Sequence, residues 1–454
     1  MKKSRFPDSL VLIFAMIILA QLLSYVLPAG EFDREERRVV PGTYHAVEAA
    51  PLPWHAFLTK IPKGLEEGAE IIFFVFIVGG VIGIVRATGA IDALIGTALH
   101  HAGGSTLLLV AGMLALFALG SSTIGMAEEY MPFIPVMVTM CLALKLDAMV
   151  ALGIVYMGAG IGYGCAALNP FTVQIAQRIS DLPPTSGQGF RWLLLLVMLA
   201  VAVQHLMRYV RRIQADPSRS LVGDVDYSEG FSMPDDTRMT GRRLTILLVF
   251  AAGIALFAYG ASELSGWGWF LVELAGIFMG IALFSAVMSS MSPNAVAKRF
   301  CSGAAELTMA ALLIGFARTI EVVLVDAKII DTVINGIAGG LEGMGPTVSV
   351  WGMLGVQSFC NFLIPSGSGQ AFVTMPIMAP LSDLVGVSRQ TAVLAYQMGD
   401  GFTNMLVPTN ALLMGMLALG KIPYQRWLAF VVPFLLKVYV AAFIALAIAV
   451  RIGY

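Results

Sequence analysis

Three carboxylates stand inside long apolar stretches of this 454-residue chain. Glu128 and Glu129 are the only charged residues in positions 104–144. Asp400 is the only one in positions 390–420. An ionised carboxylate at the centre of a bilayer costs several kcal/mol, so each of these groups needs a partner, a proton or a wet cavity. We predict that the glutamate pair binds a cationic substrate group or carries a coupling proton. A structural role is the alternative for the pair, and it has equal support for Asp400.

Two groups of polar and helix-breaking residues recur at a separation of roughly 240 positions. Each group contains a Ser followed ten residues later by a Met-Pro pair, then an MGxG element, then a short Asn/Pro/Thr segment. A broken helix exposes N–H groups at a positive dipole end and C=O groups at a negative one. The first end can bind a substrate carboxylate and the second a coupling cation. We therefore predict a binding site at the paired breaks; close helix packing is the alternative for an isolated glycine.

The composition indicates which elements must position these residues. Hydrophobic residues make up 58% of the chain and charged residues only 13%, about half of what a soluble protein carries. The net charge of −1 leaves no basic surface for a nucleic acid. Neither an ATP-binding P-loop nor an H-E-x-x-H zinc motif occurs, and the four cysteines are dispersed. We predict a membrane protein that is not an enzyme and that needs no cofactor apart from a coupling sodium ion or proton.

Apolar runs long enough to cross a bilayer extend along the whole chain. The basic N-terminus precedes a first helix at residues 10–27, which predicts a cytoplasmic N-terminus in a multi-pass protein of the inner membrane. Residues 31–63 are predicted to be an extracytoplasmic loop, and the arginine-rich residues 208–243 a cytoplasmic one. The other predicted spans are 71–85, 105–119, 149–168, 192–210, 244–259, 269–288, 304–325, 348–363, 391–407 and 428–450.

Two apolar stretches are poorly suited to a simple crossing because each has small polar residues at or near its start and at least two prolines. We predict that residues 121–144 and 365–382 are re-entrant hairpins, since irregular backbone survives at membrane depth only against protein or water. The chain then divides into a first half at residues 1–215, a cytoplasmic linker at 216–243 and a second half at 244–454.

Five segments of the sequence resemble the YfcC-like carriers of the C4-dicarboxylate anaerobic carrier (DcuC) family, and the likeness covers nearly the whole chain. These segments are residues 125–129 (GMAEE), 169–172 (NPFT), 365–380 (PSGSGQ through AP), 383–390 (DLVGVSRQ) and 399–402 (GDGF). The resemblance implies the ion-transporter superfamily architecture. This is an all-α polytopic fold with two inverted-topology repeats, each with a re-entrant helical hairpin and a broken transmembrane helix. It also implies a homodimer with a scaffold and a moving, elevator-type transport domain.

The same resemblance implies that the hairpin tips and helix breaks bind substrate and sodium. The residues at those positions are Ser121, Ser122, Thr123, Asn169, Thr172, Ser366, Ser368, Thr403, Asn404, Thr409 and Asn410. Candidate sodium positions lie near Ser122, Asn169, Ser368 and Asn404. The dicarboxylate branch of the superfamily carries Ser-Asn-Thr at both tips, whereas these tips read Ser-Ser-Thr and Ser-Gly-Ser.

These observations predict a secondary active transporter, a symporter or antiporter, for a small metabolite that bears a carboxylate. Glu128 and Glu129 favour an amino acid, in particular a basic one exchanged as in arginine/ornithine antiport, because two acids suit an ammonium group better than a second carboxylate. An ion-coupled carrier of C4-dicarboxylates is the alternative, and Arg318 would then face the second carboxylate unless it pairs with Glu321. A channel is the alternative of another class.

Overall fold

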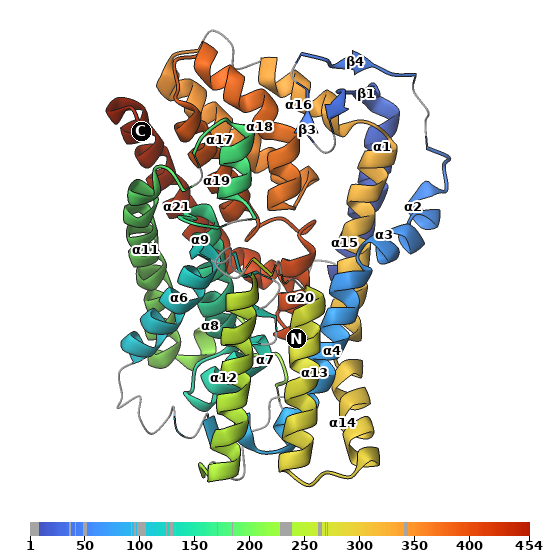
Figure 1. The fold of residues 1–454 in the computed structure, drawn as a ribbon, viewed down its shortest axis with the longest axis vertical. Coiled ribbons are helices and arrows are strands. Elements are labelled where there is room, and N and C mark those ends of the chain that lie inside the picture. The colour runs from blue at the N-terminus through green and yellow to red at the C-terminus, as the bar shows by residue number, and fades with distance from the viewer. Residues whose placement is uncertain are drawn as a thin grey trace.

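The computed structural model describes the chain at residues 9–35, 38–40, 42–48, 52–91, 93–94, 97, 106–123, 125–127, 130–131, 133–169, 171–183, 185–227, 238–261, 266–267, 269, 271–339 and 344–454. These residues are mostly helical, as their apolar composition predicts (Figure 1). The helices of the first half are α1 (Ser9–Val26), α2 (Ala56–Thr59), α3 (Ile61–Glu67), α4 (Ala69–Ala87), α6 (Thr106–Thr123), α7 (Phe133–Ala143), α8 (Ala148–Leu152), the π-helix η2 (Gly153–Met157), α9 (Gly158–Gly164), α10 (Val173–Ile179) and α11 (Gln188–Ala215).

The remaining helices follow in the same manner. They are η3 (Pro217–Arg219), α12 (Gly241–Ala261), α13 (Leu271–Met288), α14 (Pro293–Ala305), α15 (Thr308–Asp326), α16 (Ile330–Gly339), α17 (Pro346–Leu363), α18 (Gly367–Leu384), α19 (Arg389–Thr403), α20 (Ala411–Leu419) and α21 (Tyr424–Ile452). Among the described residues, α4, α6, α11 and α21 are long and apolar enough to cross a membrane.

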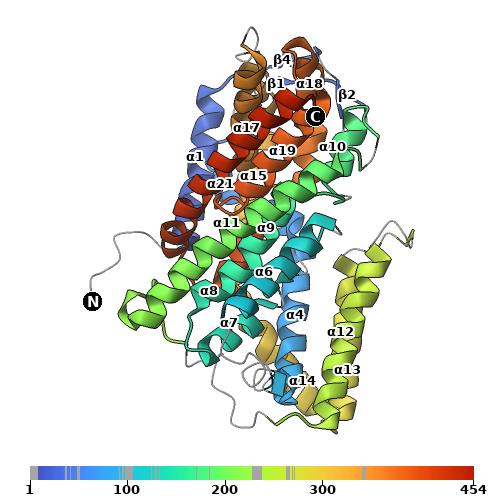
Figure 2. The same cartoon turned by 90° about the vertical axis from the view of Figure 1, so that its left-hand side faces the viewer.

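Two helix pairs enter the molecule from opposite ends. Helices α6 and α7 lie in the lower part of Figures 1 and 2, and α17 and α18 lie in the upper part. The predicted hairpin segments differ from these pairs. α6 continues through Thr123, so residues 121–144 contain its last turn and only one complete arm, α7. Residues 365–382 likewise cover α18 alone, because α17 is the other arm. The small polar residues lie where the two arms of each pair meet, rather than at the start of a separate element.

The glycines of the MGxG elements lie inside helices, not at breaks. α9 extends to Gly164 and α19 extends to Thr403, both beyond these elements. A Cβ atom placed on Gly401 would overlap the backbone nitrogen of Gly164, and one placed on Gly162 would overlap the carbonyl oxygen of Ala118. These glycines therefore allow the backbone of α9 to contact the backbones of α19 and α6. Close helix packing was the alternative to a binding role for these glycines. The helices end later, at residues 165–172 and 404–410.

We expect the Gly401→Ala variant to unfold more readily, because the added methyl group has no room between α19 and α9. Overpacking of this kind costs about 1–3 kcal/mol of folding free energy. The thermal unfolding midpoint of purified protein in detergent measures the effect. Gly355→Ala on the neighbouring helix α17 is the matched control, since a Cβ there meets no atom within 4 Å. Equal midpoints for the two variants would contradict this packing.

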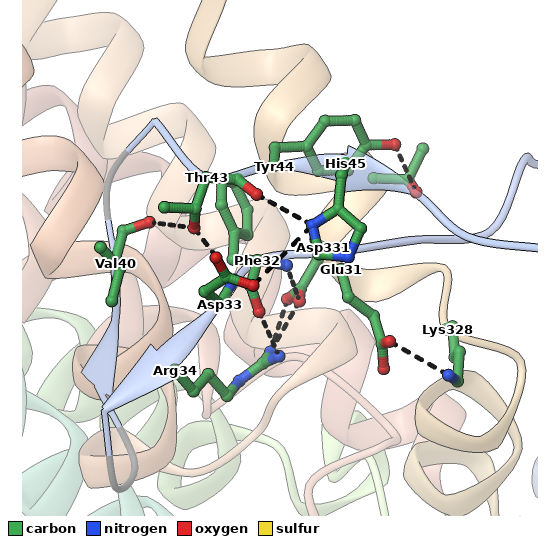
Figure 3. Close-up of polar contacts among 11 residues, drawn as sticks. Glu31, Phe32, Asp33, Arg34, Val40, Thr43, Tyr44, His45, Lys328 and Asp331 are labelled. Atoms are coloured by element: carbon green, nitrogen blue, oxygen red, sulfur yellow. Dashed lines mark hydrogen bonds and ion pairs between the residues drawn. The ribbon is translucent and has the colours of Figure 1, made fainter.

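Part of the predicted loop at residues 31–63 is folded against the second half of the chain. Strand β1 (Gly30–Glu31) pairs with β4 (His45–Ala46), and β2 (Arg34–Glu35) pairs with β3 (Arg38–Val39). The guanidinium of Arg34 donates to both carboxylate oxygens of Asp331 at 2.8 and 2.7 Å, and Asp331 is almost fully buried (Figure 3). The backbone N–H of Phe32 donates to the same carboxylate at 3.0 Å. Lys328 pairs with Glu31 at 3.0 Å, so this β-cap is fastened to the junction of α15 and α16.

The start of the predicted linker is also ordered. The carboxylate of Asp224 forms an ion pair with Arg426 at the beginning of α21, and this hydrogen bond lowers the pKa of Asp224. Asp147 caps α8 through a 3.0 Å bond from the N–H of Val150 and accepts the hydroxyl of Ser220 at 2.7 Å. These bonds hold the described residues that follow α11 against the start of α8 and the start of α21.

Candidate functional site

A cavity of about 270 Å³, lined by both polar and apolar side chains, lies where the two helix pairs and the two helix breaks meet. Four segments far apart in the sequence contribute to its wall: the junction of α6 and α7, the break after α9, the junction of α17 and α18, and the break after α19. Helices α3, α4 and α15 close the opposite side. The lining residues are Glu67, Glu70, Ile71, Gly125, Ala127, Tyr163, Phe171, Thr172, Arg318, Pro365, Ser366, Gly367, Ser368, Asn404, Thr409, Asn410, Ala411 and Leu412.

The side chain of Asn169 stabilises the non-helical backbone of the first break. Its Oδ1 atom accepts the N–H groups of Phe171 at 2.9 Å and Thr172 at 3.2 Å, and its Nδ2 atom donates to the carbonyl of Ser121 at 3.0 Å. The hydroxyl of Ser122 accepts the N–H of Ala167 at 3.0 Å. Asn169 thus satisfies backbone groups that the interrupted helix leaves unpaired. This network places Thr172 and Phe171 on the cavity wall.

The last turn of α19, just before the second break, contains the only carboxylate among the described residues of this helix. Asp400 is fully buried, and its Oδ1 atom accepts the amide of Asn361 at 2.8 Å and that of Asn404 at 3.3 Å. Its Oδ2 atom has no hydrogen-bond partner in the described part of the chain. Asn410 donates to Asn404 at 2.5 Å and caps α20 by accepting the N–H of Leu413 at 3.0 Å. A polar chain therefore connects Asp400 to the start of α20.

Gly367 brings the tip of the second helix pair against the first break and against the last turn of α19. A Cβ atom there would lie 2.6 Å from the Cγ2 atom of Thr172 and 3.2 Å from the free Oδ2 of Asp400. The phenol of Tyr396 donates to the carbonyl of Gly367 at 2.6 Å, and Ser366 caps α18 by accepting the N–H of Gly369 at 3.3 Å. Only a residue without a side chain permits this approach.

The cavity carries charges of both signs. Glu67 and Glu70 flank the joint between α3 and α4, are exposed, and form no ion pair with another described residue. Arg318 on α15 lies across this joint, with its Cγ atom 3.5 Å from the position of a Cβ on Gly68. One guanidinium nitrogen of Arg318 binds Glu321 at 2.8 Å, while its Nε–H has no partner in the described part. Arg318 therefore forms the predicted pair with Glu321, and it also lines the cavity.

Helix N-termini add positive potential to the same cavity. Ala411 and Leu412 begin α20, and Gly367 and Ser368 begin α18, and all four line the wall. N–H groups in the first turn of a helix lack intrahelical acceptors and bind carboxylates and phosphates. The cavity can therefore bind a carboxylate at the helix N-termini and Arg318, and an ammonium group at Glu67 and Glu70. No group of three or more His, Cys, Asp or Glu residues suited to a metal occurs in the described part.

The structure divides the predicted site residues into three sets. Those that line the cavity are Thr172, Ser366, Ser368, Asn404, Thr409 and Asn410. Those that lie outside its lining are Ser121, Ser122, Thr123, Asn169, Asp400 and Thr403. Glu128 and Glu129 lie outside the described residues. Of the second set, Ser122 and Asn169 hold the backbone of the first break, and the hydroxyl of Thr403 bonds the phenol of Tyr439 at 2.6 Å. Their polar groups are engaged in structure.

Sequence reasoning missed Glu67, Glu70, Tyr163 and Phe171 as cavity residues. The two glutamates immediately precede the apolar run at residues 71–85, a position typical of an interface rather than a site. The sequence therefore gave little indication that these glutamates belong to a site, because a continuous helix over residues 71–85 would leave them at its end. They reach the cavity only because α3 and α4 pack against α15.

Two interrupted helices that meet at a cavity are found in many secondary transporters. The chain belongs to the C4-dicarboxylate anaerobic carrier (DcuC) family, whose model matches residues 6–451. It is therefore a membrane transport protein of that family rather than an enzyme.

Two curated relatives match along nearly their full length. One, from Escherichia coli (strain K12), is named as a proposed basic amino acid antiporter, YfcC; it is 32% identical over 93% of this chain and 92% of its own. The other, from Haemophilus influenzae (strain ATCC 51907 / DSM 11121 / KW20 / Rd), is an uncharacterized protein, 29% identical over 95% of this chain and 94% of its own.

Two solved transporter structures are more distantly similar. MtrF of Neisseria gonorrhoeae, described with a class of antimetabolite efflux pumps, has a TM-score of 0.45 and 17% identity over 98% of this chain and 95% of its own. YdaH of Alcanivorax borkumensis has a TM-score of 0.48 and 16% identity over 99% of both chains. Both TM-scores are below 0.5, so the likeness of fold is weak.

Proposed function

We propose that the chain is a secondary active transporter of an amino acid, with a basic amino acid as the favoured substrate. The observation that carries the proposal is the cavity in which Glu67 and Glu70 face Arg318 and the N-termini of α18 and α20. A zwitterion matches this arrangement, since its carboxylate suits the helix N-termini and its ammonium group suits the glutamates. The name of the 32%-identical relative from E. coli supports the same substrate class.

A C4-dicarboxylate is the alternative substrate. Arg318 retains an unpaired Nε–H toward a second carboxylate, and the family description names this substrate class. Two glutamates on the same wall oppose it, because they would repel the second carboxylate of a bound diacid. The amino-acid assignment therefore has the stronger electrostatic support.

We further propose that Asp400 binds the coupling ion, either a proton or sodium. The carboxylate is fully buried, one of its oxygens has no partner in the described part, and it touches the tip at Gly367 through that oxygen. An uncompensated buried carboxylate is costly, so an ion or a proton at Oδ2 would stabilise it. Asn404 connects this carboxylate to the cavity, which would couple occupancy of the two sites. The candidate sodium positions near Ser368 and Asn404 lie beside it, whereas those near Ser122 and Asn169 are occupied by structural hydrogen bonds.

The arrangement of the helices is consistent with two inverted-topology repeats, at residues 1–215 and 244–454, joined by a cytoplasmic linker at 216–243. In this proposal α6–α7 and α17–α18 are the re-entrant hairpins, and they move with the broken helices as an elevator-type transport domain. Helices α3, α4, α14 and α15 belong to the scaffold, and a homodimer forms through it. The protein resides in the cytoplasmic membrane with its N-terminus inside, as the basic residues 1–5 indicate.

Counterflow in proteoliposomes tests the proposed function. Vesicles loaded with unlabelled amino acids and diacids are diluted into labelled arginine or labelled succinate, with and without a sodium gradient. We expect saturable arginine counterflow and little succinate counterflow. Succinate counterflow without arginine counterflow would assign the alternative substrate, and a flux that does not saturate would indicate a channel. Tightening of substrate binding by sodium alone would identify sodium as the coupling ion, whereas pH dependence without sodium would identify the proton.

A further inference from the structure

A second and larger cavity, of about 620 Å³, lies against several of the elements that form the central one. Its wall contains the C-terminal half of α4, part of α7, the end of α20, the N-cap of α15 and α14. Because α14 lies at the lower end of the molecule, we call this the lower cavity (Figures 1 and 2). The central cavity is lined by other parts of α4, α15, α20 and the first helix pair. The two cavities therefore follow one another along the same four segments.

A narrow apolar layer separates the two cavities. Each shared segment passes from the lining of one cavity to the lining of the other within about three helical turns. On each segment one residue lies between the two linings, at intervals of three, four or seven residues from them, and these intervals place helical residues on one face. The four residues are all buried, and we call them the apolar girdle: Val75, Met131, Ile314 and Gly415.

The girdle is tightly closed at α20. A Cβ atom placed on Gly415 would lie 2.4 Å from the Cε atom of Met131 and 3.4 Å from the Cδ1 atom of Ile314. None of the girdle residues has a polar side chain, so a charged solute cannot cross it without losing its hydration. On either side the walls are accessible: the glutamates of the central cavity are exposed, and so are Arg299 and Glu306 of the lower one. The girdle therefore lies between two cavities that both reach the surroundings.

The lower cavity lies at the end of the molecule that its basic residues assign to the cytoplasm. Arg86, in the last turn of α4, pairs with Glu306 at 3.8 Å in the wall. Arg243, at the start of α12 beside the arginine-rich segment, lies against Gly89 just beyond α4. Clustered Arg and Lys residues at one end of a membrane protein mark its cytoplasmic side. Charges of both signs at this opening suit water and a zwitterionic solute.

We propose that the lower cavity is the cytoplasmic half of the substrate route and that the apolar girdle closes this route in the present conformation. This role rests on the proposed function, which places the substrate in the central cavity. Met131 and Gly415 belong to the parts that are proposed to move, whereas Val75 and Ile314 belong to scaffold helices. A shift of the moving parts along α4 by about 10 Å, the length of seven helical residues, brings the substrate from the level of Ile71 to the lower cavity.

Thiol accessibility on α20 tests the proposal in the full-length protein. The Ala418→Cys variant places a thiol on the wall of the lower cavity, and Met416→Cys places one on the same helix away from both linings. Both are combined with Cys301→Ser, because Cys301 is exposed and the other three cysteines are buried. In inside-out vesicles, a cationic, membrane-impermeant methanethiosulfonate should modify the Ala418→Cys variant at least about tenfold faster than Met416→Cys, since buried thiols are inert. The modified Ala418→Cys variant should then lose the counterflow that it shows before modification.

Cys301 of the natural protein supplies the matched control. It is exposed on α14 next to Ser302 but does not line the lower cavity, so its modification by the same reagent should leave counterflow intact. Equal reaction rates for the two α20 variants would overturn the proposal, and so would undiminished counterflow in the modified Ala418→Cys variant. The unfolding midpoint in detergent shows whether each variant is folded.

The reaction rates need no substrate, so the proposal and the proposed function can fail separately. Rapid modification of the Ala418→Cys variant, with no counterflow of arginine or succinate by the unmodified protein, would refute the proposed function and support the cytoplasmic opening. Slow modification of that variant in a protein that exchanges arginine would refute the opening and leave the proposed function in place.

Discussion

Arginine counterflow in the Glu70→Gln variant should show a KM that is about 10- to 100-fold higher, with a maximal rate that changes little. Glu70 lines the central cavity opposite the helix N-termini of α18 and α20, and Glu67 lies one turn earlier across Gly68. A hydrogen bond to a charged group contributes about 1.5–3 kcal/mol, which corresponds to this range of affinity. The Glu67→Gln/Glu70→Gln double variant should lose arginine counterflow at any practical concentration. Initial rates against external arginine measure both parameters.

Glu66→Gln is the matched control for this experiment. Glu66 adjoins Glu67 on α3 and is exposed, but it does not line the cavity, so its replacement should leave KM unchanged. Binding of a substrate without an ammonium group should not weaken in the Glu70→Gln variant. An unchanged KM for arginine in that variant would remove Glu70 from the site and would leave the ammonium group to Glu128 and Glu129.

The Asp400→Asn variant should retain arginine counterflow but lose ion-driven accumulation. The amide oxygen of asparagine can still accept from Asn361 and Asn404, so the polar network at the second break persists. An amide neither releases a proton nor neutralises a cation, so no coupling ion is moved with the substrate. A tenfold gradient of the coupling ion is equivalent to about 1.4 kcal/mol, or about tenfold accumulation, and this gain should disappear. Accumulation under an imposed sodium or proton gradient measures it.

Asp383→Asn is a suitable control, because Asp383 is a half-exposed carboxylate in the same half of the chain that pairs with Arg389. It should accumulate arginine normally. Normal accumulation in the Asp400→Asn variant would exclude Asp400 as the coupling site. A thermal unfolding midpoint equal to that of the unaltered protein shows that the variant is folded, and counterflow shows that it still binds and exchanges substrate.

Local features of the sequence were sufficient to predict much of the helical framework. A run of apolar residues predicts a helix either by its periodicity or by its length. In this chain such runs located α4, α6, α11, α17, α19 and α21 to within a few residues. The amphipathic helix α14 and the folded β-cap were missed. The first reads as a polar segment between two apolar runs, and the second depends on the pairing of Arg34 with Asp331, which lie almost 300 residues apart. Such long-range pairs leave no periodic pattern.

The positions at which the helices are interrupted also depend on packing. The MGxG glycines suggested breaks because glycine weakens a helix. In the structure, Gly158 lies where α9 approaches α6 and Gly401 lies where α19 approaches α9, and these contacts between helices stabilise the helical backbone at both glycines. The breaks occur after Gly164 and Thr403, where Asn169 and Asn410 supply hydrogen bonds to backbone groups that the helices leave free.

Composition and spacing alone therefore predicted a polytopic membrane protein with two recurring groups of polar residues, because burial in a bilayer requires long apolar helices and restricts charge. The tertiary structure decided which polar residues face the cavity. Ser122, Asn169 and Thr172 belong to the same group of polar residues in the sequence, yet Ser122 and Asn169 form hydrogen bonds with the backbone and do not line the cavity. Glu67 and Glu70, in contrast, line the cavity from the junction of α3 and α4. Whether a polar side chain binds substrate or backbone depends on which groups lie opposite it, and that is settled only when distant helices pack together.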